Sequence, residues 1–365
     1  MTLHLYIARR FALAFIGMFF ALGMVLALVD LLEHVQRFGD RDVSFGAIVS
    51  LTLLNVPQAI YRILPLVTIL ATLALFVALS RSSELVIARA AGRSALTSLA
   101  APVVVALMIG GGAVAMMNPL VAATSKQYDT LSNRYAETAR SVLSVTDDGL
   151  WLRQASAGGQ TVIRAARANL DGTELYDTTF LAFARGGLPI SRIDAAEARL
   201  TPGEWQLSNV KLWPIAVADN PERVAVLHDS LSIPTDLTRN RIIDSFGTPS
   251  AIPIWELPAF IAQLEQAGFS ARQHRVWYQM ELALPLLLAA MVLVAAGFTL
   301  RPARFGRTGL MVAMALVLGF TLYFIRNFAQ ILGENGQIPV ELAAWGPPVA
   351  AMLLPLGLLL HLEDG

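Results

Sequence analysis

Cysteine is absent from the chain, which excludes disulfide bonds, thiolate metal sites and cysteine nucleophiles. Lysine is scarce, since Lys126 and Lys211 are the only two and arginine supplies the other basic residues. Basic and acidic residues number 27 each, so the chain lacks the basic excess of a nucleic-acid-binding protein. Charged residues make up 15% of the sequence and hydrophobic residues 55%, which is too apolar for a soluble globular protein of 365 residues.

The motifs of common active sites are also absent. The five histidines show no spacing suited to a metal site, and there is no G-x-S-x-G nucleophile elbow. No G-x-x-x-x-G-K-[ST] phosphate loop occurs, so we expect no ATP site of that type. The glycine cluster at 110–112 lies in an apolar run, where glycine more often permits close helix packing than phosphate binding. We therefore predict no catalytic residue, no metal and no cofactor in this chain.

Long apolar runs are what the sequence has in abundance. A helix needs about 20 apolar residues to cross a bilayer, and six runs could do so. They lie between Arg10 and Asp30, between Arg62 and Arg81, and at Leu99–Ala122, Leu282–Leu300, Thr308–Ile325 and Ala343–Leu362. We interpret the first run as a retained helix, because it is longer than the core of a typical signal peptide and has no clear cleavage site.

Arginine clusters indicate how these spans are oriented. With six spans, three clusters fall on the same side: Arg9 and Arg10; Arg81, Arg89 and Arg93; and Arg301, Arg304 and Arg307. The positive-inside rule then places both chain ends in the cytoplasm. Residues 43–61 are also uncharged, but a seventh span there would put the first cluster opposite the others. We therefore interpret 43–61 as an interfacial or partly inserted helix.

The segment between the third and fourth spans is polar and changes to period-two alternation, which predicts strands. The expected strands are 150–152, 161–163, 178–183, 190–193, 205–213 and 224–233. An amphipathic helix should follow at 254–268, with Leu257, Ile261 and Leu264 on one face. The expected fold is an α-helical membrane protein with six transmembrane helices (3+3) and an inserted, outward-facing, all-β domain of jelly-roll-like type. Its parts would be transmembrane helices 1–3 (1–125), a periplasmic β-domain (126–253), and a connecting helix with transmembrane helices 4–6 (254–365).

A short basic loop, Arg81–Ser94, joins the second and third spans. Its middle contains no glycine or proline, and Leu85, Ala88 and Gly92 share one helical face. We expect a helix near 82–93 that lies along the cytoplasmic surface of the membrane. A soluble motor protein could bind such a helix. The alternative is an ordinary basic cytoplasmic loop.

Charged residues near the outer ends of the spans form a second candidate site. Charges close to membrane depth cost a few kcal/mol and tend to be functional, although interfacial anchoring is the alternative. The functional interpretation is a polar rim on a cavity that receives a charged, amphipathic lipid, whose phosphates the arginines would bind. The candidates are Asp30, Glu33, His34, Arg37, Arg41, Arg62 and Arg326.

Several features together resemble a known family. Three spans, an outward β-domain and three more spans follow in order, and the loop contains Ser83-Glu84-Leu85 with Ala90 and Gly92, near the pattern S-E-L-x-x-x-x-A-x-G. Gly149-Leu150-Trp151 opens the β-domain, and the fourth span contains Pro285. The chain resembles the lipopolysaccharide-export permeases of the LptF/LptG family, and is most similar to the G-type members.

The resemblance implies a set of partners and contacts. An F-type permease would be the heterodimer partner, a homodimeric cytoplasmic ATPase would bind ATP and Mg, and a single-span subunit with its own periplasmic β-jelly-roll would receive lipopolysaccharide. Glu84, Leu85, Ala90 and Gly92 would contact the ATPase, with Arg89 as an exposed neighbour. The chain would reside in the bacterial inner membrane, with its first and fifth spans beside a lateral gate.

Two positions depart from the family. Members often carry lysines just after the first span, where this chain has Glu33 and His34, and basic residues near the start of the fourth span, where it has Glu281. Phosphate recognition at those positions is therefore in doubt.

Three functional hypotheses follow. In the first, the chain is a transport subunit, and the loop transmits the closure of partner ATPase domains to spans two and three, which narrows a cavity and expels the lipid. In the second, it is a membrane-anchored periplasmic binding or scaffold protein without transport activity, although six spans exceed what anchoring needs. An intramembrane enzyme is disfavoured, because no polar pair was identified deep in the spans.

Overall fold

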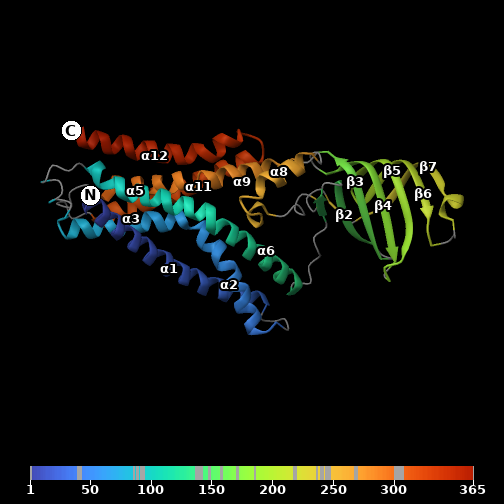
Figure 1. Cartoon of the computed structure of the whole chain (residues 1–365), viewed down its shortest axis with the longest axis horizontal. Coiled ribbons are helices and arrows are strands. Elements are labelled where there is room, and N and C mark those ends of the chain that lie inside the picture. The colour runs from blue at the N-terminus through green and yellow to red at the C-terminus, as the bar shows by residue number, and fades with distance from the viewer. Residues whose placement is uncertain are drawn as a thin grey trace. The chain divides into compact units, whose positions relative to one another are not determined.

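The structure, a computed structural model, consists of two compact units, each described here by itself. The helical unit contains Met1–Tyr135, Ser250–Trp255 and Arg272–Gly365, and the β unit contains Ala136–Pro249 and Glu256–Ala271. Figure 1 shows long helices in the first and a single sheet in the second. The structure describes residues 2–364 except 39–42, 85–86, 88–89, 91–94, 136–142, 147–148, 157–158, 170–171, 185, 217–219, 236, 239–241, 243–247, 267–269 and 300–307.

The helical unit is built from long apolar helices. In its first half they are α1 (Thr2–Phe38), α2 (Phe45–Arg62), α3 (Leu64–Arg81), α5 (Ala95–Gly112), the π-helical turn η1 (Ala113–Met117) and α6 (Asn118–Tyr135). In its second half they are α9 (Arg272–Leu282), α10 (Leu284–Thr299), α11 (Thr308–Glu334) and α12 (Val340–Asp364). Among the described residues, five helices are long and apolar enough to cross a membrane, and the pair α9–α10, bent by 51°, makes up to six. The prediction of a multi-span helical protein is confirmed, and the count is six if the bent pair is one span.

Helix α2 is a separate element, as the uncharged stretch 43–61 predicted. Ser44 caps its first turn by accepting a hydrogen bond from the backbone N–H of Ala47, and the chain leaves helical geometry at Ile63 before α3 begins. The helix runs back along α1, because Asn55 donates to Asp30 at 2.6 Å and Ile60 lies against Gly23. The first two helices therefore form an antiparallel pair.

Helix α10 is the central helix of this unit. Almost every side chain from Leu284 to Gly297 is buried, and the helix packs against α3, α5, α11 and α12. Gly110 of α5 permits a close approach to α10, since a Cβ atom there would lie 2.5 Å from the Cα of Pro285. Neighbouring Gly111 has no atom within 4 Å of such a Cβ. The packing role predicted for the glycine cluster is confirmed at Gly110.

A buried polar network links the two halves of the helical unit. The carboxylate of Glu281, at the end of α9, is 2% exposed and accepts hydrogen bonds from the Tyr61 hydroxyl of α2 and, at 3.1 Å, from the Asn118 side-chain amide of α6. The amide oxygen of Asn118 in turn accepts from the backbone N–H of Ile254 at 2.9 Å. Arg326 of α11 interacts favourably with the Glu281 charge. Hydrogen bonds and an opposite charge are what a buried carboxylate needs to remain in an apolar interior.

The β unit contains seven described strands in one antiparallel sheet. They are β1 (Leu143–Thr146), β2 (Gly149–Ser156), β3 (Gly159–Ala168), β4 (Glu174–Ala184), β5 (Pro189–Thr201), β6 (Glu204–Pro214) and β7 (Val226–Pro234). Their order in the sheet is their order in the sequence, so the described strands form a meander without the Greek-key crossing of a jelly roll. The all-β prediction is confirmed, whereas the strand order corrects its jelly-roll-like part: short turns such as Pro202-Gly203 pair each strand with the next one in the chain.

Alternate residues of these strands build the core of the sheet, as the period-two pattern predicted. Leu152, Ile163, Phe180 and Trp205 are fully buried on one face. Gln154 of β2 is also buried and accepts a hydrogen bond from the hydroxyl of Thr235, just after β7, at 2.6 Å. Because this contact joins the second strand to the end of the seventh, the sheet must curl over its apolar face.

Helix α8 (Leu257–Gln266) belongs to the β unit and buries the face predicted for it, made of Leu257, Ile261 and Leu264. The helical unit extends along α6 to Tyr135, beyond the position 126 at which the sequence placed the start of the β-domain.

The close contact at Gly110 predicts a selective effect of adding one methyl group. Gly110→Ala should lower the free energy of unfolding by about 1–3 kcal/mol, because the new Cβ would meet the backbone of Pro285. Gly111→Ala is the matched control, since its Cβ enters open space and alanine favours a helix. Thermal unfolding of the purified chain in detergent measures both, and equal melting temperatures would contradict the packing role.

The Glu281 network predicts a second stability effect. Tyr61→Phe removes one donor to a buried carboxylate and should destabilise the chain by about 1–3 kcal/mol in the same assay. Tyr278→Phe, on the helix that carries Glu281, is the control and should leave the melting temperature nearly unchanged. A Tyr61→Phe variant as stable as this control would show that the network does not hold the halves together.

Candidate functional site

The loop after α3 begins with a turn that requires an unusual backbone conformation. Ser82 ends the helix with its N–H bonded to the carbonyl of Ala78, and Ser83 has φ of 61°, in the left-handed region that non-glycine residues seldom adopt. Glu84, Ile87 and Ala90 then have helical backbone, and the N–H of Ile87 donates to the carbonyl of Ser83 at 3.1 Å. A helical segment near 82–93 was predicted, and the described residues of the loop agree with it.

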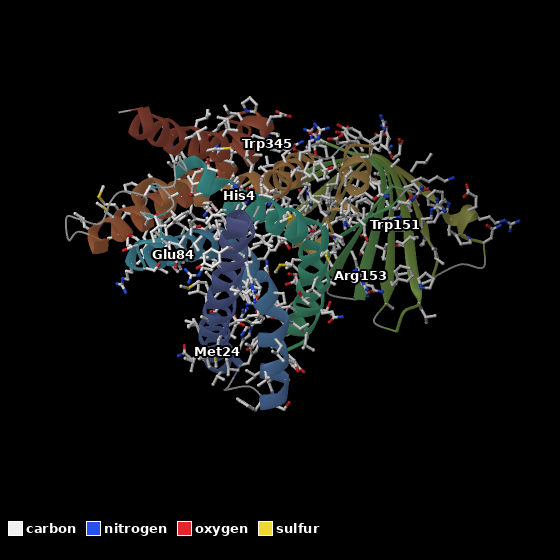
Figure 2. All side chains as sticks on the ribbon, turned by 60° about the vertical axis from the view of Figure 1, so that its left-hand side comes forward. His4, Met24, Glu84, Trp151, Arg153 and Trp345 are labelled. Atoms are coloured by element: carbon white, nitrogen blue, oxygen red, sulfur yellow. The ribbon has the colours of Figure 1, made fainter. Side chains whose placement is uncertain are left out.

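The carboxylate of Glu84 is held by three donors. The Tyr6 hydroxyl donates to Oε2 at 2.9 Å, the Arg10 guanidinium to Oε1 at 3.1 Å, and the Ser82 hydroxyl to Oε1 at 2.8 Å. Arg10 also lies over the ring of Tyr6, at 4.9 Å from its centroid. Figure 2 shows Glu84 near the end of α1 where His4 is labelled. The loop is therefore attached to the first turns of α1.

The electrostatics of Glu84 agree with this attachment. Desolvation acts to raise the pKa of the carboxyl group, but the hydrogen bonds from Ser82 and Tyr6 and the charge of Arg10 outweigh it and hold the pKa below its usual value. Glu84 is accordingly an anion at neutral pH, fixed in position by its neighbours.

The five predicted ATPase-contact residues have different surroundings. Glu84 faces α1, and Ala90 is exposed. Leu85, Arg89 and Gly92 lie outside the described residues. The structure adds Ile87, whose side chain is 67% exposed although it is apolar. Its position one turn from Glu84 on a helical loop was visible in the sequence, but its exposure was not.

Asp30 and His34, predicted as part of a lipid-binding rim, make contacts between helices, where His34 is buried and Asp30 is partly buried. His34 Nδ1 lies 2.7 Å from the carbonyl oxygen of Asp30, so this nitrogen is the donor, and Nε2 lies 2.9 Å from the hydroxyl of Tyr128 on α6. The His34 ring also stacks on Phe38. With the bond from Asn55, these contacts join α1, α2 and α6. Glu33, their neighbour, is exposed.

The three predicted phosphate-binding arginines that the structure describes do not form one cluster. Arg37 is exposed and stacks on Phe38, and Arg62 is exposed at the far end of α2. Since Ile60 lies beside Gly23, Arg37 and Arg62 are about 20 Å apart along the α1–α2 pair. Arg326 is partly buried with Glu281 as its electrostatic partner, and Arg41 lies outside the described residues. Lipid binding by these residues stays a prediction, and one phosphate group could not bridge Arg37 and Arg62.

Sequence reasoning missed the network at Glu281, which the sequence showed only as an acid near the start of a span. Its partners Tyr61 and Asn118 are separated from it by 220 and 163 positions. The chain does therefore place polar groups in contact inside its helical unit. The cluster holds one carboxylate with an arginine and amide and hydroxyl donors, and the residue chemistry is that of a structural link.

Helices α1 and α11 expose the most apolar surface. In the most apolar 18 residues of each helix, 11% of the residues of α1 and 17% of those of α11 are buried, against 61% for α3. On α1 the exposed side chains include Leu13, Phe20 and Met24, and on α11 they include Phe324 and Phe328. Apolar surfaces of this extent face lipid or a partner protein. The family resemblance implies that the same two spans lie beside a lateral gate, and this stays a prediction.

Comparison with known proteins agrees with these features. The model of the family "Lipopolysaccharide export system permease LptF/LptG" matches residues 5–361. The lipopolysaccharide export system permease protein LptG of Escherichia coli (strain K12) is 25% identical over 362 residues, which cover 96% of this chain and 93% of that protein. LptG of Haemophilus influenzae is 23% identical over 360 residues, covering 96% of this chain and 95% of that protein. The chain belongs to the LptF/LptG family of lipopolysaccharide export permeases.

Proposed function

We propose that the chain is the G-type permease subunit of an ATP-driven exporter in the bacterial inner membrane. It extracts lipopolysaccharide, or a similar amphipathic glycolipid, and passes it to a periplasmic bridge toward the outer membrane. Membership of the permease family supports this proposal, as does the similarity to two LptG proteins over nearly the whole chain. The chain itself is non-catalytic, and a partner ATPase binds ATP and Mg.

The observation that carries the proposal is the loop between α3 and α5. It presents an exposed apolar side chain, Ile87, one turn after the anchored Glu84. The preceding helix α3 is buried against the central helix α10, so force applied to the loop acts on the packed core of the unit. A homodimeric cytoplasmic ATPase grips this loop and its equivalent on an F-type permease partner.

The lipid path follows the apolar surfaces. The exposed faces of α1 and α11 border the lateral gate through which the acyl chains enter a cavity shared with the F-type partner. When the ATPase domains close, the cavity narrows and the lipid leaves toward the periplasm. In this arrangement the chain has six membrane spans, both chain ends in the cytoplasm, and the β unit in the periplasm. A single-span subunit with its own periplasmic β-jelly-roll accepts the lipid.

Mass spectrometry of the complex tests this function. The tagged full chain is purified in mild detergent from its own membranes, and copurifying proteins and lipids are identified together. A second permease, a nucleotide-binding ATPase and lipopolysaccharide are expected. A periplasmic partner without any ATPase would instead support the membrane-anchored scaffold function.

The loop contact predicts that one substitution separates the permease from its ATPase. Ile87→Arg should reduce the amount of ATPase that copurifies by about tenfold or more, because a charge would replace an apolar side chain in the centre of the contact. Leu188→Arg is the control, since the side chain of Leu188 is similarly exposed (72%, against 67% for Ile87) but belongs to the β unit. Equal ATPase recovery from both variants would contradict the role of this loop.

A further inference from the structure

The side chain of Glu84 is directed toward α1 of its own chain, whereas a residue that contacts another protein would face outward. Among the described residues, two side chains from the first turns of α1 and one from the turn after α3 donate to Glu84. Both carboxylate oxygens are engaged, and the side chain is 32% exposed. An ATPase residue that bound Glu84 would have to compete with these donors.

The backbone supports the same arrangement. Ser83 adopts φ of 61° directly before Glu84, and a residue with a Cβ atom is held in that region only when its surroundings require it. The turn brings the Ser82 hydroxyl within 2.8 Å of Glu84, and the same oxygen lies 3.1 Å from the carbonyl oxygen of Ala78, so two acceptors share its single proton. The end of α3 and the side chain of Glu84 are thus oriented together toward α1.

The energy of such a contact indicates its role. An ion pair at this degree of exposure adds little to folding stability, so it is a minor part of the stability of a 365-residue chain. Several hydrogen bonds in one fixed geometry nevertheless restrict how the loop and α1 move relative to each other. The contact therefore acts on the relative positions of two elements.

We propose that Glu84 is a positioning residue that fastens the cytoplasmic loop to α1, so that α1 moves with the loop when the loop is displaced. The attachment rests on the contacts of this chain alone, and its consequence for transport rests on the proposed function. Helix α1 is the most exposed of the candidate spans. A push on the loop then reaches the helix beside the lateral gate directly, in addition to α3 and α5.

Distance measurements on the full chain test the attachment without any transport assay. The chain has no cysteine, so Ile87→Cys and Met24→Cys introduce two unique, exposed sites for spin labels. Met24 lies about 27 Å from Tyr6 along α1, and both Met24 and Glu84 are marked in Figure 2. Pulsed electron paramagnetic resonance should give one narrow distance distribution in this background.

Removing single donors or the charge should broaden that distribution. Tyr6→Phe deletes one hydrogen bond with little change of shape, and Glu84→Gln removes the charge; both should widen the distances. Glu33→Gln, which neutralises an exposed acid of α1, is the control and should leave them unchanged. Distributions as narrow in Tyr6→Phe and Glu84→Gln as in the control would overturn the attachment.

A charge exchange tests the consequence for transport in the reconstituted complex. Arg10→Glu should lower the lipid released per ATP hydrolysed by about fivefold, the factor that corresponds to ~1 kcal/mol, while the ATPase still copurifies. The double variant Arg10→Glu with Glu84→Arg should recover most of the loss. Arg9→Glu, at an exposed neighbouring arginine, should have no effect on the ratio.

The outcomes separate the two proposals. If Arg10→Glu equals Arg9→Glu, or if the charge exchange fails to recover coupling, the role of Glu84 in transport is overturned while the exporter function stands. If the wild-type chain binds no ATPase, the proposed function is overturned, and the distance measurements alone decide whether Glu84 fastens the loop to α1.

Discussion

The buried carboxylate of Glu281 is the interaction on which the helical unit depends. An ionised group in an apolar interior costs several kcal/mol unless it is paired, and here the compensation comes from α2, α6 and α11 at once. These helices belong to different halves of the chain, and the carboxylate lies just before the bend of 51° between α9 and α10. The same region contains the π-helical turn before Asn118 and the close approach of Gly110 to Pro285. The network thus fixes where the two halves of the helical unit meet, and apolar packing around α10 stabilises the remainder of their contact.

The loop and its attachment follow from this rigid core. Helix α3 is packed on α10 over most of its length and ends at Arg81, so its last turn is a firm base for the segment that follows. The left-handed backbone conformation of Ser83 directs Glu84 toward α1, where Tyr6 and Arg10 donate hydrogen bonds to its carboxylate. Ile87 remains exposed on the next turn. One short segment therefore combines an internal anchor with an exposed apolar side chain, which is the arrangement that the proposed coupling to a soluble ATPase requires.

The second candidate site shows a different relation between charge and function. Asp30 and His34 form hydrogen bonds between helices, with Asn55 and Tyr128 respectively. The electrostatic partner of Arg326 is Glu281. Arg37 and Arg62 keep exposed guanidinium groups about 20 Å apart along the α1–α2 pair. A lipid that used both would have to be an extended one. The polar groups at the ends of the spans are accordingly divided between holding the bundle together and facing its surroundings.

The sequence by itself determined the helical spans, the all-β character of the polar segment, the buried face of α8 and the family, because hydrophobic periodicity and motif order are local properties of the chain. It also located the loop and placed a glycine contact at 110–112. Tertiary structure alone decided the meander order of the strands, the burial of His34 beside Asp30, the network at Glu281 and the inward direction of Glu84. Each of these depends on partners far away in the sequence, such as Tyr6 for Glu84 and Tyr61 for Glu281. Whether a charge faces solvent or a neighbouring helix is set by how helices pack, and no local pattern of residues encodes that choice.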